Sequence, residues 1–216
     1  MATDIWGRRM ERHHIGGRAF DRAAAAVAVL GVVAVIAANL VVAWLHPTTG
    51  LIADTISNLA AGRYHWWLDA ALALLRLGIV LLAFALWDMK LDAWRWKLGV
   101  LCIGLVGFGV AVIALWNEYG DGEPGGVTVH FEVVIAMGLL FTVGTVLLSL
   151  GLSRIGTFWS GLSVLTGVLW LAFGAWFFFS DDGWDGLIER VAAAMLVLWV
   201  LAMARLVGRE RTPDPL

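Results

Sequence analysis

The sequence is poor in charged residues and in cysteine. Only 15% of its 216 residues are charged and 61% are hydrophobic, whereas about a quarter of the residues in a soluble domain are charged. These proportions exclude an ordinary water-soluble core and indicate that lipid surrounds much of the surface. The single cysteine, Cys102, cannot form an internal disulfide, and its apolar surroundings are typical of a small buried side chain.

The chain also lacks the motifs that would name a reaction. It contains no glycine-rich phosphate loop, no nucleophile elbow and no paired-cysteine motif. Its first and last three predicted helices show no internal repeat, which weakens the case for a secondary transporter. No basic stripe stands out beyond the tails, so we do not expect nucleic acid as a partner. We expect no bound cofactor.

What the sequence does contain is six apolar stretches, each long enough at about 20 residues to cross a bilayer. They predict an all-α, polytopic membrane protein: a six-helix transmembrane domain over 22–207, between tails at 1–21 and 208–216. The first apolar run is too long for the roughly 7–15-residue core of a signal peptide. The helices are expected at Arg22–Leu45, Trp67–Trp87, Leu98–Trp116, Val129–Gly151, Phe158–Phe179 and Leu187–Val207.

Basic residues predict the orientation. With six helices, twelve of the fifteen Lys and Arg fall on one side, and the positive-inside rule places that side in the cytoplasm. Both termini are therefore expected to be cytoplasmic. The twelve are Arg8, Arg9, Arg12, Arg18, Arg22, Lys90, Arg95, Lys97, Arg154, Arg205, Arg209 and Arg211.

Tryptophan supports the same placement, because Trp favours the membrane interface. Six of the thirteen Trp fall near the predicted outer boundary and four near the inner one, as expected of aromatic belts. The outer group is Trp44, Trp66, Trp67, Trp116, Trp176 and Trp184, and the inner group is Trp87, Trp94, Trp96 and Trp159.

Glycines indicate where helices can approach closely. Small residues at a helix interface let two backbones come together. We expect this either within the bundle or at a dimer seam, at Gly104, Gly107, Gly109, Gly161 and Gly167.

The predicted outer loop, 46–66, is rich in polar residues. Pro47 and Gly50 stop the first helix. The stretch 53–59 then suits a short interfacial helix capped by Asp54. On such a helix Asp54 and Ser57 share one face. These two residues and Asn58 are either turn and cap residues or part of a working site.

More polar residues gather at the same outer end. His130 and Glu132 begin the fourth predicted helix, and Glu189 and Arg190 begin the sixth. A carboxylate near a helix N-terminus gains from the helix dipole, so both glutamates could serve only as caps. The alternative is that they belong to a functional cluster.

Two polar residues lie deeper, Asn39 on the first helix and Arg76 on the second. A charged arginine at that depth costs at least a few kcal/mol unless it is paired or wetted. We expect Glu132 or Glu189 to pair with Arg76, and Asp69 on the same helix is also within reach. Arg76 would then either tie helices together or line a cavity.

Three histidines, His46, His65 and His130, fall on the outer side near carboxylates. Such a set can bind zinc. However, no two of them share a helix at ligand spacing, and positions at helix ends do not suit axial haem ligation. We therefore expect no metal site. If a metal were bound, these three histidines would be the candidate ligands.

The arrangement resembles a bacterial six-helix membrane family, domain of unknown function 998. The matching pieces are the segment 54–64 after the first helix, His130 at the head of the fourth, and 186–190 opening the sixth. Members usually carry Asp or Glu after the serine, where this chain has Asn58. The resemblance implies a protein of the bacterial plasma (inner) membrane and supplies no established reaction.

The resemblance adds weight to one cluster, formed by Ser57, His130, Glu189 and Arg190. It leaves three hypotheses open. The first is a non-catalytic packing partner, assembly factor or accessory subunit, with membrane lipids and other subunits as partners. The second is an outer-leaflet enzyme acting on a lipid or lipid-linked group, and the third is a small transporter or lipid carrier along Asn39, Arg76 and Glu132.

The enzyme hypothesis assigns a role to each polar residue. Ser57 would be the nucleophile or a substrate contact, and His130 the general base. Glu132 or Glu189 would orient the base, and Arg76 or Arg190 would anchor a headgroup phosphate.

Overall fold

The computed structural model describes residues 14–45, 50–60, 63–89, 91–92, 94–115, 129–180 and 183–209. These residues form helices and no strands, which confirms the all-α class. The helices are α2 (His14–Leu45), α3 (Ile56–Ala60), α4 (His65–Met89), α5 (Trp94–Leu115), α6 (Val129–Leu152), α7 (Thr157–Phe177) and α8 (Asp185–Gly208).

Six of these helices are long and apolar enough to cross a membrane, namely α2 and α4 to α8. This confirms the predicted helix count. The boundaries differ in detail, since α2 begins at His14 rather than Arg22 and α7 ends at Phe177 rather than Phe179. At its other end α2 is described as far as Leu45, and Pro47, which was predicted to stop it, lies outside the described residues.

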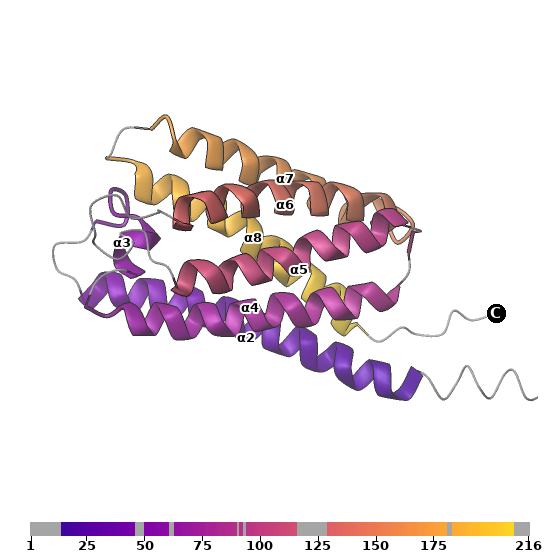
Figure 1. Cartoon of the computed structure of the whole chain (residues 1–216). Coiled ribbons are helices and arrows are strands. Elements are labelled where there is room, and N and C mark those ends of the chain that lie inside the picture. Colours follow the sequence, from indigo (N-terminus) through magenta and orange to yellow (C-terminus); the bar gives the residue numbers. More distant parts are fainter. Residues whose placement is uncertain are drawn as a thin grey trace, which may run out of the picture.

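The spanning helices form a closed ring. Each packs against the next, α2 on α4, α4 on α5, α5 on α6, α6 on α7 and α7 on α8, and α8 packs back onto α2. α2 begins and α8 ends at one end of the bundle, which we call the terminal end (Figure 1). The short helix α3 lies at the opposite end, which we call the α3 end (Figure 1).

The backbones of α2 and α4 approach each other closely at two glycines. A Cβ atom added to Gly78 would lie 2.5 Å from the Cα of Ala28, and one added to Gly31 would lie 2.6 Å from the Cα of Leu75. These distances are too short for any side chain, so two glycines on facing helices bring the backbones together. Sequence reasoning missed both positions.

The glycines singled out from the sequence give a mixed result. Gly167 packs on Thr145, whose Oγ1 would lie 2.1 Å from an added Cβ, and Gly109 packs on the side chain of Met137. Gly107 also faces close neighbours. At Gly104 the nearest atom would be 3.9 Å away, and at Gly161 nothing lies within 4 Å. The prediction of tight contact within the bundle was therefore wrong for these last two glycines, and the alternative of a dimer seam stays a prediction.

Large aromatic side chains fill the core from the middle of the bundle toward the terminal end. Trp96, Phe141 and Trp199 are fully buried. The Trp199 Nε1–H donates to Ser163 Oγ at 2.9 Å, and the Trp96 Nε1–H donates to the Leu86 carbonyl at 2.7 Å. Trp96 thus belongs to the core rather than to an interfacial belt, which corrects the prediction, and its indole has a polar partner as buried Trp requires.

Packing at the α3 end is uneven around the ring. Among the described residues, α5 buries none beyond Val110, α6 none before Met137, and α7 none beyond Gly167. On the other side, α3 joins α2 and α4 in a second small core that includes Val42, Leu59 and Leu68. The ring is therefore tightly packed at the α3 end only where α3 sits on α2, α4 and α8.

Candidate functional site at the α3 end of the bundle

Glu189, in the first turns of α8, holds the start of α3. Its Oε2 accepts the backbone N–H of Ile56, and its Oε1 accepts the Ser57 hydroxyl at 3.0 Å. The first N–H groups of a helix have no partner inside the helix, and the helix dipole favours a negative charge there. Glu189 therefore caps α3 from a distant part of the chain, and it uses both carboxylate oxygens to do so.

The helix cap within the loop is Thr55 rather than Asp54. The Asn58 N–H donates to Thr55 Oγ1 at 3.0 Å, as expected of an N-cap threonine. Because α3 begins at Ile56, Asp54 lies outside it, and its Oδ2 accepts the Gly50 N–H at 2.7 Å instead. The prediction that Asp54 caps the helix was therefore wrong, and so was the shared helical face with Ser57.

Arg190 gathers backbone oxygens from the loop. Its Nη1 donates to the carbonyls of Leu51 at 2.9 Å, Asp54 at 2.7 Å and Gly186 at 2.9 Å. Its Nε donates to Asn39 Oδ1 at 3.2 Å, which ties α8 to α2. Nη2 of Arg190 and Nδ2 of Asn39 are buried and have no acceptor among the described residues. These two donors are therefore unsatisfied within the described part of the chain.

The backbone of α8 also lies directly on the loop. The Leu187 N–H donates to the Ile52 carbonyl at 2.9 Å. A Cβ on Gly186 would lie 2.2 Å from the Asp54 carbonyl oxygen, so only glycine fits there. We call Asn39, Gly186, Glu189 and Arg190, with the residues 50–58 that they hold, the α3 clamp.

The clamp brings together most of the candidate site residues that the sequence suggested. His130 is not among the residues that form it. His130 is half-buried at the start of α6 and has interactions of its own. The hydrogen bonds described for Ser57 do not include His130, so the proposed Ser57, His130 and Glu189 arrangement stays a prediction. Glu132 has an exposed side chain on α6.

Arg76 does not pair with the carboxylates that we expected. Asp69 binds His65, with Nδ1 and Oδ2 2.7 Å apart, Glu189 caps α3, and Glu132 is exposed. In the described part of the chain no ion pair to Arg76 is found. The pairing prediction was therefore wrong, because residues at a similar depth on different helices need not face one another. Arg76 is half-buried and lies about 16 Å along α4 from His65.

The histidines do not come together as a metal site in the part of the chain that the structure describes. His46 lies outside the described residues. His65 is exposed and bound to Asp69. Among the described residues no group of three His, Cys, Asp or Glu side chains could hold a metal ion.

Two contributors to the architecture carried little signal in the sequence. Thr55 is buried and caps α3, yet a threonine beside an aspartate looks like the weaker cap candidate. At the terminal end, Arg154 donates through Nη1 to the Leu91 carbonyl, and its Nη2 lies 3.4 Å from Asp92 Oδ1, which ties the loop before α5 to the turn after α6. The sequence marked the segment Gly186 to Arg190 as part of a polar cluster, but only the structure shows that this segment binds the loop and the start of α3.

Comparison with known proteins gives one finding. No curated protein and no solved structure matches this chain. The model of the family described as "Protein of unknown function (DUF998)" matches residues 23–206, which include most of α2 and α8, the other four helices of the ring and the whole α3 clamp. This match covers most of the sequence, and the chain belongs to the DUF998 family of membrane-type helical proteins.

Proposed function

We propose that this protein is a non-catalytic membrane component, acting as an assembly factor or accessory subunit of a larger membrane complex. The observation that supports this most is how the α3 clamp uses its charges. Arg190 donates to three backbone carbonyls and to Asn39, and Glu189 caps α3. Groups that are already bonded to the backbone serve architecture, and their release for substrate chemistry would leave these carbonyls and the α3 N–H without their partners.

A surface for a second membrane protein also exists. The most apolar stretch of α7 is 22% buried inside the chain, whereas the corresponding stretches of the other five spanning helices are 39–44% buried. α7 therefore leaves the largest share of its surface for lipid or for another helix. Exposed apolar side chains run along it, including Leu165, Val168 and Leu171. We place the contact with the partner on this face of α7.

One contact keeps an enzyme as the second candidate. Ser57 Oγ lies 3.0 Å from Glu189 Oε1, which is the distance needed for a carboxylate to accept a proton from a nucleophilic serine. An outer-leaflet enzyme acting on a lipid or lipid-linked group would use this pair. The same carboxylate also binds the Ile56 N–H, which lowers its availability as a base.

A transporter is less favoured. A transport path has to continue from Arg76 toward the terminal end, and there Trp96, Phe141 and Trp199 are fully buried. A path that stops halfway moves nothing across a membrane.

The experiment is gentle extraction in native lipid with mass spectrometry of the co-purifying proteins and lipids. With the wild type we expect a second membrane protein to co-purify at a fixed ratio, such as one-to-one. This partner should be absent from preparations of the double variant Leu165→Trp with Val168→Trp on α7. The matched control is Leu30→Trp with Val33→Trp on α2, whose side chains are similarly exposed. A solitary protein would overturn the proposal.

The same preparation tests the enzyme candidate. Turnover of added phospholipid by the wild type, abolished in Ser57→Ala, would favour the enzyme over the accessory subunit. The variants His130→Ala and Arg76→Ala then test whether these two candidate residues contribute to turnover.

A further inference from the structure

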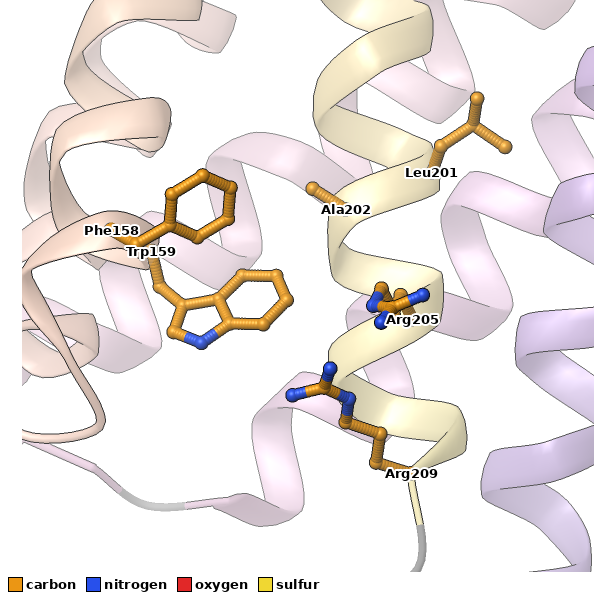
Figure 2. A pocket seen from close by; sticks show the side chains of 6 residues that line it. All are labelled: Phe158, Trp159, Leu201, Ala202, Arg205 and Arg209. Carbon is orange, nitrogen blue, oxygen red and sulfur yellow. The ribbon is translucent and has the colours of Figure 1, made fainter.

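A cavity of about 490 Å³ lies between α7 and α8 at the terminal end, away from the α3 clamp. Figure 2 shows two aromatic side chains reaching toward it from α7 and two arginines at the end of α8. It is lined by Phe158, Trp159, Leu201, Ala202, Arg205 and Arg209.

The charged side of this cavity is formed by Arg205 and Arg209. Arg205 lies in the last turn of α8 and Arg209 directly follows its end, and because both line the cavity, both guanidinium groups can reach the same ligand. Both side chains are exposed, and among the described residues neither forms an ion pair. Arg209 lies over the ring of Trp159, with 5.8 Å between its Cζ and the ring centroid. The aromatic ring positions the cation without neutralising it.

The other side of the cavity is apolar. Phe158 is 66% exposed, and its ring meets that of Trp159 edge-to-face with centroids 5.3 Å apart. Leu201 and Ala202 continue the apolar lining one turn along α8 toward the middle of the bundle. Moving inward along the helices, the lining therefore changes from cationic to hydrocarbon.

We infer that this cavity binds an anionic phospholipid, with the headgroup phosphate at Arg205 and Arg209 and an acyl chain along Phe158 and Leu201. Paired arginines bind phosphate through charge-assisted hydrogen bonds, and basic pockets between spanning helices bind anionic headgroups. A free phosphate ion would use the arginines but gain nothing from the apolar lining. The inference does not depend on the proposed accessory role.

The test is native mass spectrometry of the full-length protein in mild detergent with dioleoyl phosphatidylglycerol or dioleoyl phosphatidylcholine added. For the wild type we expect one phosphatidylglycerol bound roughly ten-fold more tightly than phosphatidylcholine. The double variant Arg205→Gln with Arg209→Gln should lose this preference. The variant Arg205→Lys with Arg209→Lys keeps the charges and should retain most of it.

Arg95 and Lys97 provide the matched control. They are exposed basic residues at the same end of the bundle, they also lie over tryptophan rings, and they do not line the cavity. Arg95→Gln with Lys97→Gln should leave the preference unchanged. If the double Arg variant does not give a monodisperse protein, Arg209→Gln alone should reduce the preference by roughly three-fold.

Three results would overturn the inference. One is equal binding of the two lipids by the wild type, and another is a preference that survives the glutamine substitutions. The third is inorganic phosphate that competes as strongly as phosphatidylglycerol, which would make the arginines a site for the free ion rather than for lipid.

Discussion

The α3 clamp shows what distinguishes arginine from lysine in a half-buried position. Arg190 presents a planar fork of five donors. It makes four hydrogen bonds to four different partners on α2, α8 and the loop. A lysine ammonium is a point charge with three donors and cannot reach Asn39 and the loop carbonyls in the same geometry. The residue type therefore follows from the number and direction of the acceptors.

We expect Arg190→Lys to destabilise the protein while it still folds. Loss of the Nε bond to Asn39 and of part of the carbonyl contacts should lower Tm by roughly 5 °C. Thermal unfolding in detergent, followed by circular dichroism, measures this. Arg95→Lys, at an exposed position, serves as the control and should change Tm by less than about 1 °C. Equal Tm values for the two variants would contradict the role assigned to Arg190.

At the scale of single residues, the sequence predicted which polar groups lie at one end of the bundle but not how they pair. Ser57, Glu189 and Arg190 do meet in the clamp. Arg76 meets none of the expected carboxylates, because topology gives only depth in the membrane, whereas pairing depends on the rotation of each helix about its axis. Rotation is decided by packing, which a single sequence encodes weakly.

At the scale of elements, α3 is the clearest case of a helix made by its surroundings. It has five residues, and isolated helices shorter than about 12 residues are marginal in water. Its first N–H groups are satisfied by Glu189 and Thr55, and Leu59 is buried against α2 and α4. The helix therefore depends on contacts from α2, α4 and α8 in addition to its own cap.

Removal of the cap from α8 should loosen α3 without unfolding the bundle. In Glu189→Ala the Ile56 N–H and the Ser57 hydroxyl lose their acceptor, so we expect amide hydrogen exchange over 55–60 to accelerate roughly ten-fold. Exchange in α4 and α6 should stay as in the wild type. Glu132→Ala removes an exposed carboxylate and should leave α3 unaffected. Unchanged exchange in Glu189→Ala would show that α3 does not need this cap.

Helix contacts give a second prediction at this scale. Gly78 faces the backbone of α2, where a Cβ at this position would lie 2.5 Å from the Ala28 Cα, while a Cβ at Gly104 would meet nothing closer than 3.9 Å. Gly78→Val must therefore push α2 and α4 apart, and we expect a loss of the monodisperse peak in size-exclusion chromatography. Gly104→Val, also in mid-helix, should elute as the wild type does. A normal profile for Gly78→Val would refute the close approach of the two helices.

These glycines also show why elements are easier to predict than their contacts. The six spans follow from length and apolarity alone, and all six are present. Gly104 and Gly78 are both mid-helix glycines with apolar neighbours, so nothing local tells them apart. Trp96 was similarly assigned to the interface by its position near a helix end, whereas its indole turns inward to the Leu86 carbonyl.

At the scale of the whole molecule, the two ends of the bundle differ in chemistry. At the α3 end the charged groups bind the backbone of the loop, since Glu189 accepts a backbone N–H and Arg190 donates to backbone carbonyls. The terminal end has a packed aromatic core and, between α7 and α8, arginines that form no described ion pair. This difference between bonded charges at the α3 end and arginines without a described ion pair at the terminal end fits a protein whose own loop closes one end and whose other end contacts charged lipid.

The orientation of the bundle can be tested with two isoleucines, Ile52 at the α3 end and Ile155 at the terminal end, both exposed. Cys102 is the sole cysteine and is buried, so Cys102→Ala gives a clean background for single cysteines. The positive-inside rule predicts that Ile52→Cys reacts with a membrane-impermeant maleimide in intact cells, and that Ile155→Cys reacts only after permeabilisation. The reverse pattern would place Arg205 and Arg209 outside, and the lipid that their cavity binds would then belong to the outer leaflet. Labelling of both sites in intact cells would instead mean that the described ring does not span the membrane as six helices.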